Sequence, residues 1–319
     1  MSGLGFLLWV RAHATPWLDA IMGGISYLGT EYFYLPALCF LYWCIDAAGT
    51  LRLFVLFLCS FYLRDAVKEI ARVPRPFQVH PQLQARFTET AEGFAFPSGH
   101  AVDSTVFWGY LAISMRKRWL YVVAPAMVVL IGFSRLYLGL HWPRDVLWGL
   151  VFGLVILGLG YVLIRLLAGV PIRARFPATL VLLLVPLLLF LLLPSHGGAQ
   201  SMGALFGAGL GYLLERQYVR FRVRGPAWQQ LLKTTIGLAG AFLLLFGLRA
   251  LFEPLLPSIS TVSLVPESTP PAFRGFLYGR GYESLTFVRY TLVGLWATLV
   301  APALFRLFFG REEESRAAV

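Results

Sequence analysis

The sequence predicts an all-α protein whose helices form a bundle that crosses a membrane about nine times. Apolar residues make up 58% of the 319 residues and charged residues only 13%, about half the charged share of an ordinary globular domain. The runs 146–164 and 176–214 carry no Asp, Glu, Lys or Arg at all. Because about 20 apolar residues suffice for one helical span, these blocks indicate a polytopic membrane protein.

The elements follow in order from the N-terminus. Residues 4–10 are apolar but too few to span, and Arg11 follows them without a small-residue cleavage pattern, so we expect a helix lying at the membrane interface. The first expected span carries Glu31 and Pro36, which predicts an irregular or broken helix. The nine expected spans cover approximately 26–46, 51–69, 99–115, 119–138, 144–166, 176–194, 198–214, 231–251 and 286–308.

Basic residues set the expected orientation of the spans. They concentrate in connections that lie on one predicted side of the membrane: Arg52, 116–118, 165–175 and 216–233. Connections rich in Lys and Arg are typically cytoplasmic. The segments 70–98 and 139–143 are then expected on the outer face and the C-terminus inside. An odd number of spans places the N-terminus outside, whereas a re-entrant first element would place it inside.

Other features narrow the class of protein. The net charge is +11, and the arginines cluster between the apolar blocks. They form no basic stripe interleaved with aromatic residues, so no nucleic-acid partner is expected. Cys39, Cys44 and Cys59 all lie in apolar stretches, without the spacing of a disulfide framework or a zinc site. The sequence does not predict an oligomeric state.

Two parts of the chain are expected. Residues 1–170 contain every polar cluster described below, and residues 171–319 are expected to complete and extend the helix bundle. Within the second part, the segment 253–284 is rich in Pro, Ser and Gly and is expected to form an outward-facing loop.

The first polar cluster ends the second expected span. Lys68 and Arg75 are seven residues apart and so can project from one helix face, while Pro74 and Pro76 are expected to stop the helix. Two fixed cations at a span end suit a phosphate, since Arg binds it with two hydrogen bonds and Lys acts as a point charge. Taken alone, the pair could also extend towards lipid headgroups.

The second cluster precedes the third expected span and reads Pro97-Ser98-Gly99-His100. Ser98 is a candidate N-cap, and Gly99 allows an anion to approach the free N–H groups of a helix start. His100 in the first turn can act as a proton donor. An ordinary capping turn is the alternative.

The third cluster reads Ser134-Arg135, then His141 and Asp145. A helix beginning near Pro143 would let Asp145 accept a hydrogen bond from one imidazole nitrogen of His141, which fixes the tautomer and leaves the other nitrogen free to attack. Arg135 can return to the same phosphate. The alternative is a belt of aromatic and basic residues at the membrane interface.

Together the three clusters resemble the signature motifs of the type 2 phosphatidic acid phosphatase (PAP2) superfamily. The strings K-x6-R-P, P-S-G-H and S-R-x5-H-x3-D occur in that order without substitution, within about residues 65–165. The resemblance implies a catalytic core of six helices, with the C-terminal spans as an extension. The high span count also resembles the sphingosine-phosphate phosphatase branch.

The resemblance implies a role for each matched residue. His141 is implied to be the nucleophile, Asp145 its orienting partner, and His100 the proton donor to the leaving oxygen. The implied phosphate ligands are Lys68, Arg75, Ser98, Gly99 and Arg135.

The expected activity is hydrolysis of a lipid phosphate or diphosphate through a phosphohistidine, without metal or other cofactor. The expected site faces outward from a bacterial inner membrane. The alternatives are a lipid phosphotransferase using the same intermediate, and a lipid transporter or scaffold that retains the core. A haloperoxidase holding vanadate in an equivalent pocket is disfavoured by the membrane setting.

Overall fold

The computed structural model describes residues 3–91, 93–168, 183–191, 196–252 and 271–317, and every regular element within them is a helix. The predicted all-α class is therefore confirmed. The chain forms two compact units. The first contains residues 1–38 and 51–169, and the second contains residues 39–50 and 170–319.

The first unit begins with a broken helical segment, which agrees with the irregular first span that was expected. Helices α1 (Leu4–Ala12) and α2 (Pro16–Tyr27) precede α3 (Glu31–Cys44), and residues 28–30 interrupt the helix. The prediction of a span over 26–46 is therefore wrong at its start. At 1.5 Å per residue the 14 residues of α3 reach only about 21 Å, which is less than the ~30 Å of a bilayer core.

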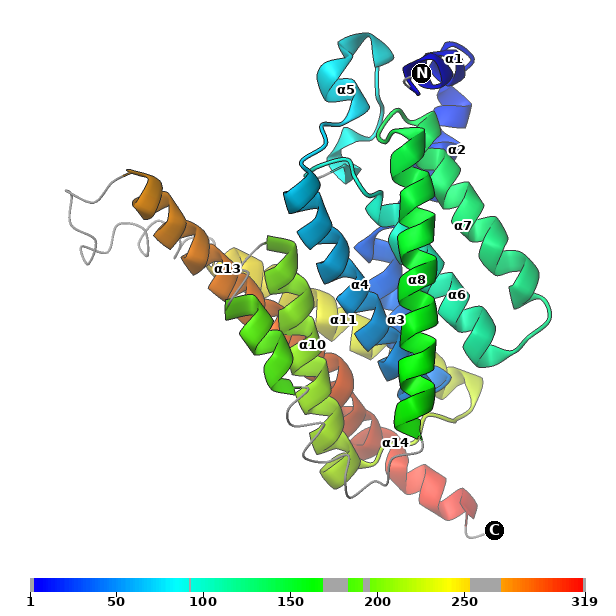
Figure 1. Ribbon diagram of the computed structural model, residues 1–319. Coiled ribbons are helices and arrows are strands. Elements are labelled where there is room, and N and C mark those ends of the chain that lie inside the picture. The colour runs from blue at the N-terminus through cyan, green and yellow to red at the C-terminus, as the bar shows by residue number, and fades with distance from the viewer. Residues whose placement is uncertain (1–2, 92, 169–182, 192–195, 253–270, 318–319) are drawn as a thin grey trace. The chain divides into compact units, whose positions relative to one another are not determined.

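Four long helices follow as predicted. They are α4 (Ala47–Ala71), α6 (Gly99–Met115), α7 (Leu120–Tyr137) and α8 (Pro143–Ala168). Helix α6 packs against both α7 and α8, and the three run side by side in Figure 1. The core between α3, α4 and α6 is aromatic, with the ring of Tyr34 within 5.0 Å of the ring centres of Phe57 and Phe107.

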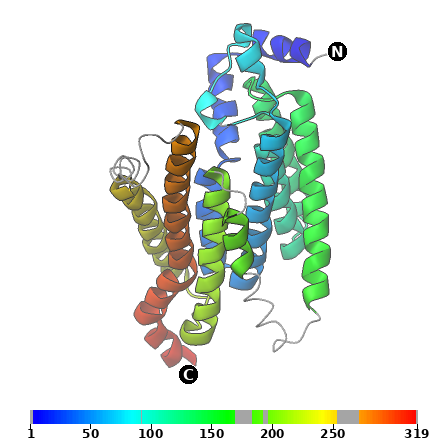
Figure 2. The same ribbon diagram turned by 60° about the vertical axis from the view of Figure 1, so that its left-hand side comes forward.

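The connections that carry the polar clusters share one end of this unit. After α4 come the short helices α5 (Pro76–Val79), η1 (Pro81–Leu83) and η2 (Thr88–Thr90), and they lie at the same end as the turn between α7 and α8 (Figure 1). Helix α1 lies across that end in Figure 2. In the α7–α8 turn, Gly139 has a φ of +74°, a backbone conformation that residues with a side chain rarely adopt.

The second unit is built around a stripe of glycines. It contains α10 (His196–Leu214), the π-helical turn η3 (Glu215–Val219), α11 (Ala227–Phe252), α13 (Pro271–Leu295), the π-helical turn η4 (Trp296–Val300) and α14 (Ala301–Ala317). Gly203, Gly207 and Gly211 recur every four residues on α10. A Cβ atom at Gly207 would stand 2.0 Å from the carbonyl oxygen of Thr291 on α13. Small residues at this spacing let two helix backbones touch, as is common between membrane helices.

Five described helical segments are long and apolar enough to cross a membrane: 47–79, 120–137, 143–166, 227–252 and 281–309. Within α8, only 17% of the most apolar 18-residue stretch is buried, so most of the apolar side chains of this helix are exposed at the surface of the structure. A chain with several such helices is an integral membrane protein.

The predicted count of nine spans is not confirmed. Besides α3, α6 has 17 residues, one fewer than the shortest candidate span. The expected span 176–194 lies largely outside the described residues, which there include only the helical segment 183–191.

The predicted loop 253–284 needs correction in its second half. Residues 253–270 lie outside the described part of the chain, but residues 271–284 form the first half of α13. Pro271 opens this helix, where its fixed φ is favourable. No further proline follows until Pro302, and the intervening glycines lower helix stability by only about 1 kcal/mol each. The Pro-Gly-rich composition therefore did not break the helix after its first residue.

Candidate active site

Arg75 is the centre of the first cluster, and it lies in an extended segment after α4. The helix ends at Ala71, so Arg75 is not held on one helix face with Lys68 as the spacing suggested. Its side chain is 1% exposed. The guanidinium donates to the backbone oxygens of Gly93, Phe94 and Leu140 over 2.9–3.3 Å. Arg75 therefore joins the segment before α6 to the α7–α8 turn.

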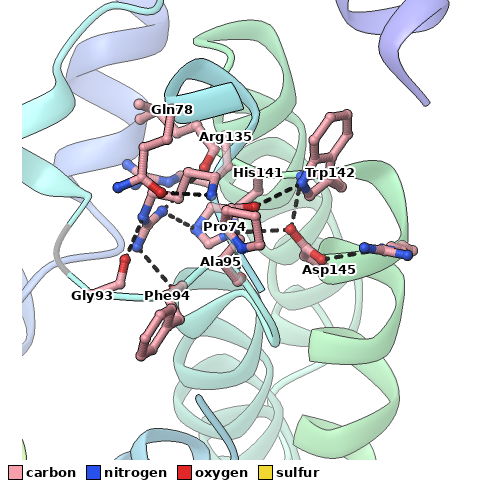
Figure 3. A network of polar contacts seen from close by, with 12 residues as sticks. Pro74, Gln78, Gly93, Phe94, Ala95, Arg135, His141, Trp142 and Asp145 are labelled. Atoms are coloured by element: carbon pink, nitrogen blue, oxygen red, sulfur yellow. Dashed lines mark hydrogen bonds and ion pairs between the residues drawn. The ribbon is translucent and has the colours of Figure 1, made fainter. Parts of the chain in front are cut away.

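The same guanidinium reaches His141. Its NH1 group lies 3.1 Å from Nε2 of the imidazole, while Nδ1 of His141 lies 2.8 Å from the backbone oxygen of Ala95 (Figure 3). A carbonyl can only accept and a guanidinium can only donate, so Nδ1 carries the proton and Nε2 presents its lone pair. His141 is thus held as the neutral tautomer that a nucleophilic Nε2 requires.

Asp145 lies beside His141, but its hydrogen bond is with the backbone of Trp142. As predicted, α8 begins at Pro143, and Oδ2 of Asp145 accepts the backbone N–H of Trp142 over 2.9 Å. The same oxygen is 3.7 Å from Nδ1 of His141, too far for a hydrogen bond but close enough for an ion pair when the ring is charged. Figure 3 shows Asp145 between Trp142 and His141.

The start of α6 forms a second side of the site. Ser98 occupies the N-cap position, but its hydroxyl makes no capping bond and is buried without a partner among the described residues. Its backbone N–H donates to the carbonyl of Asp145 over 3.0 Å, which ties α6 to α8. Nε2 of His100 is likewise buried and unpartnered in the described chain. Unpartnered buried polar atoms at a helix N-terminus suit an anionic ligand.

Arg135 is fully buried at the end of α7 and is already engaged. Its NH1 group donates to the hydroxyls of Ser26 (2.5 Å) and Thr90 (2.8 Å), and NH2 donates to the backbone oxygen of Thr90 (3.0 Å). Nε is buried without a partner in the described residues. The hydrogen bonds hold the guanidinium between α2, η2 and α7.

Lys68 and a further cation, Arg64, lie one helical turn apart on α4. Lys68 is 9% exposed. Arg64 forms an ion pair with Asp103 of α6, with Nε 3.2 Å from Oδ1, and a Cβ atom at Gly99 would stand 2.2 Å from its NH1 group. Arg64 therefore packs directly against the glycine of the second cluster, a role that its sequence position did not indicate.

These positive charges act on the imidazole of His141. Burial and the nearby charges of Arg75, Arg135 and Lys68, with a further contribution from His100, hold the pKa of His141 well below its usual value of about 6.5. The imidazole is therefore neutral at pH 7 in the ligand-free protein, which agrees with the hydrogen bonds at its two nitrogens.

Backbone hydrogen bonds connect the three clusters. Trp142 donates its indole N–H to the carbonyl of Pro74 over 3.1 Å, and the N–H of Ala95 donates to the carbonyl of Val73 over 2.8 Å. Contacts of Ala95, Thr90 and Ser26 with the candidate site were not anticipated. A carbonyl group gives no sequence signal, and Ser26 lies far from every motif.

Among the described residues, no group of three or more His, Cys, Asp or Glu side chains is placed to hold a metal ion. The candidate site instead gathers the cationic side chains of Lys68, Arg75 and Arg135. Metal independence stays a prediction, and an assay can test it.

Comparison with known proteins identifies the family in two consecutive stretches. The model of the PAP2 superfamily matches residues 49–167, and the model described as "PAP2 superfamily phosphatase, transmembrane extension" matches residues 199–313. The second match covers α10, α11, α13 and most of α14. The C-terminal helices thus belong to a recognised extension of the family.

Individual relatives cover different shares of the chain. Phosphatidylglycerophosphatase B of Bacillus subtilis is 30% identical over 159 residues, which are 44% of this chain and 72% of that protein. Sphingosine-1-phosphate phosphatase 2 of mouse is 34% identical over 42% of this chain and 39% of its own length. The chain therefore spans less than half of the mouse protein, and the expected branch stays a prediction.

A crystal structure described as the first transmembrane PAP2 type phosphatidylglycerolphosphate phosphatase from Bacillus subtilis is also similar. It is 26% identical, with a TM-score of 0.44 over 51% of this chain and 84% of that one. The complete motif set, the two family matches and the coverage of the Bacillus relative agree: the chain belongs to the PAP2 superfamily of lipid phosphatases.

Proposed function

We propose that this protein hydrolyses a lipid phosphate or diphosphate through a phosphohistidine on His141, without a metal. One observation carries the proposal most directly. The Nδ1–H of His141 is bound to the carbonyl of Ala95, so the lone pair of Nε2 points to the Arg75 guanidinium. A phosphate drawn to that guanidinium would arrive at the nucleophilic atom.

Binding would exchange one hydrogen bond for a stronger one. In the ligand-free site, NH1 of Arg75 donates to the neutral Nε2 of His141. A phosphate oxygen is a charged acceptor and forms a shorter and stronger bond with a guanidinium. The entering phosphate would therefore take the Arg75 donor and release the Nε2 lone pair for attack.

The reaction then proceeds in two displacements. Nε2 of His141 forms a bond to phosphorus while the bond to the lipid oxygen breaks, and His100 donates a proton to that departing oxygen. Water next attacks the phosphohistidine, His100 takes its proton, and inorganic phosphate leaves with His141 restored. Lys68, Arg75 and Arg135, with Ser98 and the N–H groups at Gly99, would stabilise the charge on the equatorial oxygens.

The substrate class follows from the family and from the setting of the site. Relatives are named as phosphatases of phosphatidylglycerophosphate and sphingosine 1-phosphate. The site lies at one end of an apolar helix bundle, where a headgroup can enter while its chains stay in the bilayer. We propose residues 1–170 as the catalytic part and residues 171–319 as the helices that complete and extend it.

A phosphate-release assay in detergent tests the proposal. The protein is incubated with a panel of lipid phosphates and diphosphates in the presence of EDTA, and free phosphate is measured. We expect turnover with EDTA, and His141→Ala should lose at least ~10³-fold, about 4 kcal/mol of transition-state stabilisation. Residual wild-type-like hydrolysis in that variant would refute the nucleophile, and activity abolished by EDTA would refute metal independence.

The intermediate and the competing transferase activity need separate measurements. With a ³²P-labelled substrate and rapid quenching, the wild type should carry an acid-labile, base-stable phosphate that His141→Ala lacks. Transfer of label to an added alcohol or lipid acceptor in place of phosphate release would identify a phosphotransferase.

We also propose that the site faces the periplasm from a bacterial inner membrane. The argument is the basic character of the connections 116–118 and 216–233, which typically face the cytoplasm. The exposed Gln82 lies at the site end of the first unit. In a cysteine-free background, Gln82→Cys should react with a membrane-impermeant maleimide in intact spheroplasts. Labelling only after lysis would reverse the orientation.

A further inference from the structure

We propose that the end of α2 and the turn between α2 and α3 form a fourth segment of the candidate active site, in which Gly29 positions His100 and Ser26 positions Arg135. The inference rests on the proposed function. It concerns residues that precede the region matched by the family model, which begins at residue 49.

Gly29 lies directly against the imidazole of His100. A Cβ atom at position 29 would stand 2.6 Å from Cδ2 and 3.2 Å from Cγ of that ring, and 2.8 Å from Cγ2 of Ile131. Real Cβ atoms do not approach other heavy atoms within 3.0 Å. The ring can therefore occupy its place only because residue 29 has no side chain.

Ser26, in the last turn of α2, contacts the guanidinium of Arg135. Its fully buried hydroxyl accepts a hydrogen bond from the NH1 group of Arg135 over 2.5 Å. The other acceptors of that guanidinium belong to Thr90, so Ser26 supplies its anchor on the α2 side. The short segment 26–29 thus contacts both the proposed proton donor and a proposed phosphate ligand.

Local hydrogen bonds keep the turn in place. The N–H groups of Leu28, Gly29 and Thr30 donate to the carbonyls of Ile25, Ser26 and Tyr27 over 2.9–3.1 Å. The hydroxyl of Thr30 also donates to the carbonyl of Tyr27 over 2.7 Å. The turn is therefore a fixed support for His100, and a group added at residue 29 would displace the ring.

The two roles predict different kinetic effects. A misplaced His100 should slow departure of a poor leaving group, which needs the proton, more than that of a good one. A loosened Arg135 should weaken phosphate binding and so raise KM. Loss of folded protein would lower all rates in the same proportion.

The experiment compares matched variants on matched substrates. Gly29→Ala is paired with Gly24→Ala on α2, where an added Cβ atom would meet nothing within 4 Å. Ser26→Ala is paired with Ser60→Ala. Among the described residues, the fully buried hydroxyl of Ser60 bonds only to the carbonyl of Phe57 in its own helix. The substrates are decyl phosphate, with an alkoxide leaving group, and 4-decylphenyl phosphate, with a phenolate leaving group.

We expect Gly29→Ala to lower kcat for decyl phosphate by ~10-fold or more relative to Gly24→Ala, and to change the aryl ester less than ~3-fold. Ser26→Ala should raise KM for both esters relative to Ser60→Ala, with kcat little changed. Equal losses on both esters for Gly29→Ala, or values that match Gly24→Ala, would overturn its positioning role. An unchanged KM in Ser26→Ala would overturn the role of Ser26.

The failure of the proposed function has its own signature. Wild-type protein that releases no phosphate from either ester, and from no member of the lipid panel, overturns the activity itself. Wild-type protein that hydrolyses only the aryl ester keeps the activity but removes proton donation by His100, and with it the role of Gly29.

Discussion

The Nδ1–H of His141 donates to the carbonyl of Ala95 over 2.8 Å, and the imidazole is thereby fixed before any substrate binds. Asp145, the predicted orienting partner, lies 3.7 Å away and accepts the backbone N–H of Trp142. The carboxylate is therefore better placed to stabilise the positive charge that develops on the ring than to select its tautomer.

This division of roles predicts a moderate effect of Asp145→Asn. The amide oxygen can still accept the Trp142 N–H, so the start of α8 should stay folded, while the negative charge beside the phosphorylated ring is lost. We expect kcat to fall by ~10-fold, about 1.4 kcal/mol, with the melting temperature nearly unchanged. Steady-state kinetics and thermal unfolding of the purified variant measure both. A rate equal to wild type would remove Asp145 from the mechanism.

The electrostatics of the site predict where the acid limb of the pH profile lies. The pKa of His141 is lowered by burial and by Arg75, Arg135 and Lys68, so a proton binds to Nε2 only at more acidic pH than usual. Since the proposed attack requires the neutral form, kcat/KM, which reports the free enzyme, should stay high down to below pH 6.5.

The variant Arg75→Gln should move that limb upward. It removes the closest positive charge, so protonation of His141 becomes easier and the residual activity should decline at a higher pH than in the wild type. The measurement is kcat/KM from pH 4.5 to 8.5 for both proteins. A limb at the same pH in both, or a wild-type limb above 6.5, would contradict the assigned charges.

A stability prediction concerns the ion pair of Arg64 and Asp103, which joins α4 to α6 beneath the second cluster. Their side chains are 11% and 6% exposed. Asp103→Ala would leave the buried Arg64 with Asp65, 3.3 Å away, as its remaining ion-pair partner among the described residues. Since Asp65 is the more exposed of the two carboxylates, the loss should still destabilise the first unit, by about 3 kcal/mol. The double variant Arg64→Met/Asp103→Leu should recover much of this loss. The measurement is the thermal unfolding of the three proteins in detergent. A double variant that is as unstable as Asp103→Ala would refute the argument.

The glycine stripe of α10 predicts a large effect from a small change. Gly207→Ala puts a methyl group where the carbonyl of Thr291 lies 2.0 Å away, so α10 and α13 must separate. The control is Gly247→Ala on α11, where an added Cβ atom meets nothing within 4 Å. We expect Gly207→Ala to lower the yield of folded protein and its melting temperature, and Gly247→Ala to leave both unchanged or slightly improved. Equal behaviour of the two variants would show that close packing at Gly207 is not required.

The sequence was most informative where chemistry restricts the choice of residue. The expected helices over 51–69, 99–115, 119–138 and 144–166 correspond to α4, α6, α7 and α8, because long apolar runs bounded by Pro, Gly or basic residues leave few alternatives. The motif residues likewise identified both connections that meet at the site.

Features that depend on backbone atoms or on missing side chains could not be read in the same way. The Ala95 carbonyl that holds His141 belongs to a residue type with no functional signature. Gly29 contributes by the absence of a Cβ atom, and any glycine looks the same in a sequence. The first half of helix α13 was missed because composition alone does not show that Pro271 opens a helix.

Arg75 has a consequence for how such a protein can change over evolutionary time. Its guanidinium bonds three backbone carbonyls from two separate connections, besides the imidazole of the candidate nucleophile. One side chain thus both holds the two connections together and is available to bind a ligand. A homologue that had lost phosphatase activity would still need this arginine for the structure of its connections. The presence of the arginine in a distant homologue is therefore weak evidence that the homologue is an enzyme.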